Sequence, residues 1–144
     1  MPSRPAPVQL PHPPVWIGGN GRNARRRAAR AAQGWSPLLI DERFAATTRT
    51  AALCTPDDLA AAVSDLRELT EAEGRDPAAL DVQVQSRHSD VLIDGGSLDE
   101  HRNHLGEIAG AGASWFVVRV PGSSLSEATE ALARYGREVL GGPR

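Results

Sequence analysis

The fold is decided by the stretch Pro14-Val15-Trp16-Ile17-Gly18-Gly19-Asn20-Gly21-Arg22-Asn23. Its apolar start predicts a short β-strand, its glycines predict a turn, and the alanines and arginines that follow predict a helix. Glycine lets a backbone approach an anion closely, and the first N–H groups of a helix have no partner within it. The turn therefore predicts a phosphate site, although a connection that uses glycine only for steric reasons explains the same residues.

The composition is that of one ordinary globular domain. The 144 residues are 40% hydrophobic and carry a formal net charge of -2, which argues against a general nucleic-acid binder. No apolar run is long enough to span a membrane, and the segment before Pro14 lacks the apolar core of a signal peptide. Cys54 stands alone and cannot form an intramolecular disulfide, so we expect a cytoplasmic protein.

Beyond the opening stretch, the pattern of a short apolar run followed by a helix start repeats. Four such units are visible, with strands expected at 15–17, 35–40, 80–84 and 115–120 and helices at 23–33, from 55, from about 98, and at 125–140. Thr55 precedes Pro56, and both Ser97 and Ser124 have a glutamate three residues later, which are helix N-terminus signals.

The expected inner faces of these helices follow the 3.6-residue period. The first helix would bury alanines, and the later ones mainly leucine, valine and isoleucine. These positions are Ala24, Ala28, Ala31 and Ala32; Leu59, Val63, Leu66 and Leu69; Leu105, Ile108 and Ala109; and Leu125, Ala128, Leu132, Tyr135 and Val139.

A repeated strand–helix order predicts an α/β fold with parallel strands and right-handed helical crossovers. Four βα units make half of a TIM (β/α)8 barrel, which has eight. A complete barrel needs roughly 250 residues, so this chain is too short to form one. We expect residues 1–13 to be an extended proline-rich lead-in and residues 14–144 to be the half-barrel domain. A small flavodoxin-like open sheet is the alternative architecture.

Several short motifs resemble the luciferase-like monooxygenase family, in particular its oxidoreductases that depend on the deazaflavin coenzyme F420. They are the Pro14-to-Gly21 segment, Arg26-Arg27-Ala28-Ala29-Arg30, Gly34-Trp35-Ser36-Pro37, Gly74-Arg75-Asp76-Pro77, Ala111-Gly112-Ala113 and Val120-Pro121-Gly122. The resemblance runs from about Pro14 to the C-terminus and corresponds to strands five to eight of the family's barrel.

The resemblance implies a TIM-barrel oxidoreductase that uses F420 or FMN, with F420 preferred, for hydride transfer or oxygenation. The family's loop after the fifth strand receives the cofactor phosphate, which here corresponds to Gly18, Gly19, Asn20, Gly21 and Arg22. The chain departs from the family in having Gln33 where an aspartate is common. It also lacks the first four strands and most substrate contacts, so no catalytic residue is assigned.

Other chemistry-bearing residues have simpler explanations. His101 and His104 share a helix face at a spacing that metal ligands can use, but no third ligand is evident and we expect an exposed face without metal. His88 is expected in a polar loop. We expect the arginines from Arg22 to Arg30 to form a solvated helix face. Only Arg22, which lies nearest the turn, is also expected to contact the phosphate.

The remaining candidates are read as structural residues. Trp16, Trp35 and Trp115 lie in or beside strands and are expected to pack in the core. Cys54 has no evident histidine partner, so it is read as a structural cysteine. Arg119 and Ser123 would lie at the rim of the barrel mouth, where a role in binding is open.

A half barrel has two unpaired strand edges and an uncovered inner sheet face. We therefore expect a homo-oligomer or a partner chain that supplies the first half of the barrel. The function predicted is the cofactor-binding half of a luciferase-like oxidoreductase, incomplete alone. A noncatalytic remnant or protein-interaction domain is the alternative.

Overall fold

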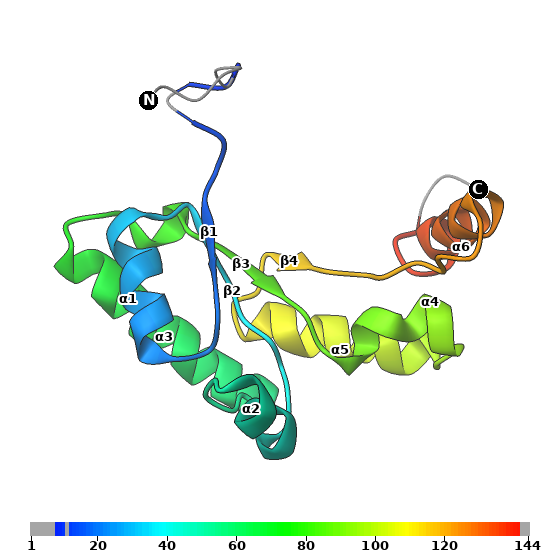
Figure 1. Cartoon of the computed structure of the whole chain (residues 1–144), viewed down its shortest axis with the longest axis horizontal. Helices are drawn as coiled ribbons and strands as arrows, with labels where there is room; N and C mark the ends of the chain where they lie inside the picture. The colour runs from blue at the N-terminus through cyan, green and yellow to red at the C-terminus, as the bar shows by residue number, and fades with distance from the viewer. Residues whose placement is uncertain (1–7, 11, 142–144) are drawn as a thin grey trace.

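The sheet of this protein has four parallel strands, as the sequence predicted (Figure 1). The computed structural model describes residues 8–10 and 12–141, so most of the expected 1–13 lead-in lies outside the described residues. The strands are β1 (Trp16–Gly18), β2 (Gly34–Ser36), β3 (Asp81–Val84) and β4 (Trp115–Phe116), arranged in chain order. Each neighbouring pair is parallel, which confirms the α/β fold class.

Strand alternation separates a helix-covered face from an opposite face. Trp35, Val82 and Val84 are buried with residues of the helices, in the main core. Gly34 and Ser36 flank Trp35 and therefore point the other way, together with Trp16, which pairs in register with Gly34. A Cβ on Gly34 would lie 2.9 Å from the Trp16 indole, so this close approach requires glycine.

Four longer helices follow the strands at the predicted places. They are α1 (Arg22–Ala31), α3 (Pro56–Ala72), α5 (Leu98–Gly110) and α6 (Leu125–Glu138). The predicted N-caps are confirmed: the side chains of Thr55, Ser97 and Ser124 each accept a hydrogen bond from the backbone three residues later. The Asp58 side chain in turn accepts a hydrogen bond from the Thr55 backbone N–H, which completes a capping box. Within the described residues, no helix has the length and apolar character needed to cross a membrane.

Two hydrophobic clusters hold the chain together. The main cluster lies between the sheet and α1, α3 and α5, and includes the predicted Leu59, Val63, Leu66 and Ile108. Ala31 and Ala109 were expected there but are exposed. A second cluster joins α6 to α5 and α4 (Val91–Asp94) through Val91, Leu92 and Tyr135.

Arg75 ties α1 to the chain that follows α3. Its guanidinium donates to the backbone carbonyls of Ala28, Ala29 and Ala32 at distances of 3.1, 2.5 and 2.6 Å. These carbonyls lie at the end of α1, where the helix dipole favours a positive charge, and the Ala28 carbonyl also accepts from the Ala32 N–H. The Gly74-to-Pro77 motif therefore has a structural role.

The connections between strands contain elements that the sequence did not predict. The helix α2 (Glu42–Thr48) lies in the long connection after β2, where the Asp41 side chain caps it by accepting from the Phe44 N–H. A short 3-10 helix, η2 (Arg87–Asp90), and α4 lie between β3 and α5, and a second, η1 (Pro77–Ala79), precedes β3.

The predicted strand at 115–120 is wrong in length. It ends at Phe116, because Val118 and Val120 leave the sheet to pack against the second cluster. Figure 1 shows an extended segment after β4 that leads to α6. Leu125 and Leu132, predicted to be buried, are 85% and 52% exposed because α6 contacts the body through the neighbouring face that carries Tyr135.

Candidate functional site

The turn after β1 is fixed by hydrogen bonds to β2. Gly19 has φ +105°, a conformation that side chains of L-residues rarely adopt. Its N–H donates to the Ser36 carbonyl at 3.3 Å, and its carbonyl accepts from the Trp35 indole N–H at 2.8 Å. The glycine at this position is thus required by the backbone, whatever the turn binds.

Asn20 is completely buried and connects three loops. Its amide nitrogen donates to the carbonyls of Leu38 and Ala51, and its Oδ1 accepts from the Leu38 N–H, all at 2.8 Å. Its backbone N–H donates to the Thr50 hydroxyl at 3.0 Å. These bonds leave Asn20 no donor for a ligand. Asn20 was predicted to contact the phosphate, but the structure gives it a structural role instead.

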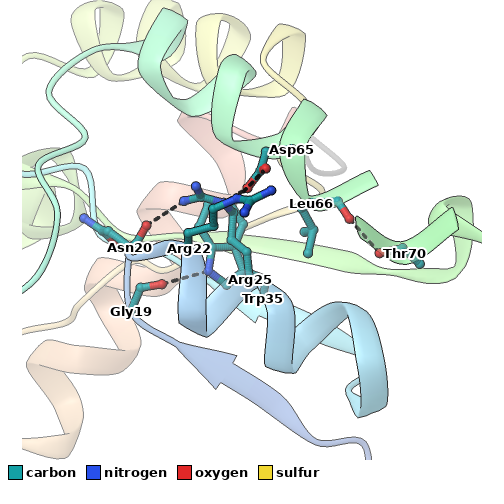
Figure 2. Close-up of polar contacts among 8 residues, drawn as sticks. All are labelled: Gly19, Asn20, Arg22, Arg25, Trp35, Asp65, Leu66 and Thr70. Carbon is teal, nitrogen blue, oxygen red and sulfur yellow. Dashed lines mark hydrogen bonds and ion pairs between the residues drawn. The ribbon is translucent and has the colours of Figure 1, made fainter. Parts of the chain in front are cut away.

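Two arginines of α1 converge on one carboxylate of α3 (Figure 2). Arg22 Nε lies 3.2 Å from one oxygen of Asp65, and Arg25 Nε lies 2.7 Å from the other. Arg25 also donates to the Asn20 carbonyl. Burial acts to raise the pKa of Asp65, but the hydrogen bonds and charges of Arg25 and Arg22 outweigh it and hold this pKa below its ordinary value. The turn therefore has two guanidinium groups beside one carboxylate.

The start of α1 keeps free hydrogen-bond donors. Its N-cap is Gly21, which has no side chain to cap the helix, and the first turn contains no acidic residue. Within the described part of the chain, no hydrogen bond engages the backbone N–H of Gly21, Arg22 or Asn23. The Arg22 side chain beside them is 55% exposed. Of the predicted residues, Gly21 and Arg22 thus offer free donors, whereas the donors of Gly19 and Asn20 are engaged.

Asn23 is a donor that the sequence interpretation missed. The helix start itself carried the signal, because a helix that begins at Arg22 leaves the N–H groups of its first residues unpaired. Gly18 ends β1 and is exposed at the same edge of the sheet.

A separate cleft of about 1040 Å³ opens past the ends of β2 and β3. Its walls come from α2, the start of α3, the chain after β3 and one face of α5, and they include Cys54, His88, His104 and Arg119. None of the Gly18-to-Arg22 residues lines it. The predicted phosphate turn and this cleft are therefore two distinct places.

The prediction that His101 and His104 form an exposed helix face is wrong. Both are buried, because Tyr135 of α6 contacts His101, and His88 of η2 and Phe116 of β4 lie against both rings. His104 Nε2 lies 2.9 Å from the Ser86 hydroxyl, and the His88 ring stacks on His104 with centroids 4.2 Å apart. Phe116 contacts both buried histidines edge to face. His88 is thus half-buried in a histidine cluster with His101 and His104.

Burial keeps this histidine cluster neutral at pH 7. Burial, and after it the charges of His88, His101 and Arg87, lower the pKa of His104 to about 4. Burial and then Arg87 lower the pKa of His88, and burial and then His88 lower that of His101. In the described ranges, no group of three or more His, Cys, Asp or Glu residues is arranged to hold a metal ion.

The other sequence candidates form local contacts. Arg119 pairs with Asp90, and Ser123 with Glu127 one turn into α6. Cys54 is exposed, and its backbone N–H donates to Asp58. Arg26, Arg27 and Arg30 form the expected solvated face of α1. Trp35 is a core residue as predicted, but Trp115 is 56% exposed.

Comparison with known proteins gives similarity in structure only. No protein-family model matches the chain, and no curated protein matches its sequence. Among solved structures, it is similar to the coenzyme F420-dependent tetrahydromethanopterin reductase from Methanopyrus kandleri, with a TM-score of 0.60, 15% identity, and 89% of this chain and 50% of that chain covered. It is also similar to the monooxygenase RslO1 from Streptomyces bottropensis, with a TM-score of 0.63, 15% identity, and 92% and 49% covered.

Both of these structures have the luciferase-like fold, a TIM barrel. At 15% identity the similarity shows the fold alone. The chain spans about half the length of each of these two proteins. Its four parallel βα units therefore have the fold of part of a luciferase-like TIM barrel.

Proposed function

We propose that this chain is the cofactor-binding half of a luciferase-like oxidoreductase that uses F420 or FMN, with the cofactor phosphate at the start of α1. The observation that carries the proposal is the set of free N–H groups on Gly21, Arg22 and Asn23 beside the half-exposed Arg22. The likeness to an F420-dependent reductase and to a monooxygenase supports it.

The residues at this helix start fit a phosphate group. Three backbone donors and the positive end of the helix dipole favour a dianion. The first turn of α1 holds no carboxylate that would repel it, and Asp65 is already engaged by Arg25, which leaves Arg22 able to turn toward a ligand. The fixed Gly19 and the buried Asn20 hold this backbone rigid. Gly18 and Gly19 would then line the approach.

A bound deazaflavin or flavin would supply the redox chemistry of hydride transfer or oxygenation. The chain's own contribution in this proposal is to hold and orient the phosphate end of the cofactor. We assign no catalytic residue, because the resemblance places most substrate contacts in the family's first four strands.

Binding can be measured by titrating the protein with F420 and with FMN and following cofactor fluorescence. Inorganic phosphate should compete with either cofactor at the helix start. Saturable binding that phosphate weakens supports the proposal. A lack of phosphate-sensitive binding would instead favour the alternative of a noncatalytic remnant or interaction domain.

The variant Gly21→Asp tests the site without disturbing the fold. Gly21 has φ -70° and ψ 153°, and a Cβ placed there meets nothing within 4 Å. An aspartate at this N-cap would engage the free N–H groups and stabilise α1 by about 1 kcal/mol. It would also repel phosphate, so we expect at least a tenfold loss of cofactor affinity in a protein that is as stable as the parent or more so.

The matched control is Gly21→Asn, which caps the helix without a negative charge. It should weaken cofactor binding less than Gly21→Asp. If both variants bind cofactor as the parent chain does, the phosphate does not lie at the start of α1.

A further inference from the structure

The two ends of the sheet share an exposed concave face. Trp16 of β1 and Trp115 of β4 pack edge to face with ring centroids 6.1 Å apart. Three strand spacings of about 4.8 Å each separate β1 from β4, so these rings can meet only if the sheet curves strongly toward them. Their face is opposite to the one that packs against α1, α3 and α5, and Trp115 remains 56% exposed on it.

This concave face corresponds to the interior of a TIM barrel, where the helices form the outer ring. In a closed barrel it would be buried by the facing strands. Its other side chains include Ser36 and Gln83, whose polar groups hydrogen-bond to each other at 3.0 Å. An isolated copy therefore leaves open a surface that in a barrel is buried.

Exposed apolar side chains gather at the two ends of this sheet and on the helix after it. Nine large apolar residues are exposed in the described part of the chain, and five of them lie beside β1, in β4, or in and just after α6: Val15, Trp115, Leu125, Leu132 and Leu140. Leu125 and Leu132 are seven residues apart and so share one face of α6. This face of α6 is exposed in the described part of the chain.

We infer that two copies of this chain associate around a two-fold axis, with β4 of each copy parallel to β1 of the other. The four strands run the same way, and within the described residues no strand pairs with the outer edge of β1 or β4. One kind of contact, made twice, would therefore close an eight-stranded ring. The chain's match to about half the length of TIM-barrel structures agrees with a ring of two copies.

In this dimer β4 of each copy would hydrogen-bond to β1 of the other copy along each seam. The tryptophan pairs of both copies would lie in the closed interior. The inference concerns the fold and does not depend on a cofactor, so it can fail or hold independently of the proposed phosphate site.

The first test is the mass of the purified chain in solution, by sedimentation or light scattering. We expect a particle of twice the 15.3 kDa chain mass at micromolar concentration. A stable monomer would overturn the inference, and a monomer that assembles only when a different chain is added would show that another polypeptide is the partner. Open-ended polymers would also contradict it, because they require a contact that does not close.

Charged substitutions locate the interface. Trp115→Asp should raise the dimer dissociation constant by about tenfold or more, since it places a charge in the closed interior of the ring. Ile93→Glu is the matched control, because Ile93, at 52%, is also exposed but lies on α4, away from both sheet edges. A dimer weakened by Ile93→Glu and not by Trp115→Asp would place the interface elsewhere.

Cross-linking tests the pairing of strands even if Trp115→Asp fails to fold. In a Cys54→Ser background, one chain carries Val15→Cys and another carries Val117→Cys. A short flexible thiol cross-linker should join the mixed chains efficiently and each chain alone poorly, because β1 would lie beside β4. Efficient linking of Val117→Cys chains to one another would instead indicate that β4 pairs with β4.

Discussion

The Nε2 atom of His101 and the hydroxyl oxygen of Tyr135 lie 2.9 Å apart, and this buried hydrogen bond joins α5 to α6. His101 is fully buried and Tyr135 is 8% exposed. Burial lowers the pKa of His101 and raises that of Tyr135, so both groups are neutral at pH 7. The Nδ1 atom of His101 is buried and has no hydrogen-bond partner among the described residues. The Tyr135 hydroxyl is therefore the main polar partner of this ring.

Replacing Tyr135 with phenylalanine should destabilise the protein. The substitution removes the hydroxyl and leaves a buried ring nitrogen unpaired, which costs about 1–3 kcal/mol. The free energy of unfolding can be measured by urea denaturation. In a His101→Phe background the same substitution should cost less, because no nitrogen is left unpaired. An equal loss in both backgrounds would mean that the hydrogen bond does not contribute to stability.

Stability should fall when the solution is acidified through the range of the histidine cluster. The unfolded chain takes up a proton on each histidine near pH 6.5, whereas folded His104 does so only near pH 4. Between these values the unfolded state binds more protons, so the free energy of unfolding falls by about 1.4 kcal/mol per pH unit for each such histidine. Urea midpoints between pH 7.5 and pH 4 would show the slope.

Two variants identify the source of that slope. His104→Gln keeps a polar group near Ser86 but cannot take up a proton, so its pH profile should be flatter than that of the parent. His12→Gln replaces an exposed histidine outside the cluster and serves as the control. A parent profile that is flat from pH 7.5 to pH 4 would contradict the buried, neutral state of His104.

Local signals explain why much of the fold could be predicted from the sequence. Caps such as Thr55, Ser97 and Ser124 act within three residues, so the helix starts follow from the sequence alone. The parallel order follows from the repeat of strand and helix. The helix α2 was missed because it has seven residues and buries only Ala45, which leaves no clear periodic stripe.

The site was predictable only where it depends on helix geometry. The free donors at Gly21 and Arg22 follow from where α1 begins. The bonds of Asn20 reach residues 18 and 31 positions away along the chain, and no local pattern encodes them. The burial of His101 and His104 depends on His88, Phe116 and Tyr135, which come from other segments of the chain, so the spacing alone gave the wrong prediction.

Arg75 should be important for the stability of α1. Arg75→Ala removes charged hydrogen bonds to three carbonyls at the end of that helix, and we expect a loss of about 2–3 kcal/mol in the free energy of unfolding. Arg75→Lys should give an intermediate loss, because an ammonium group cannot reproduce the fork of guanidinium donors. Arg26→Ala, on the exposed face of α1, serves as the control and should change stability by less than about 0.5 kcal/mol.

Gly34→Ala tests the packing of Trp16 across β2. The added Cβ would lie 2.9 Å from three atoms of the indole, so Trp16 must move and its contact with Trp115 must change. We expect a loss of about 1–3 kcal/mol and a shift in tryptophan fluorescence. Gly106→Ala is the control, since a Cβ there meets nothing within 4 Å and alanine should stabilise α5 by about 0.5–1 kcal/mol. In a Trp16→Leu background Gly34→Ala should be tolerated better; an unchanged penalty would show that the strain does not come from the indole.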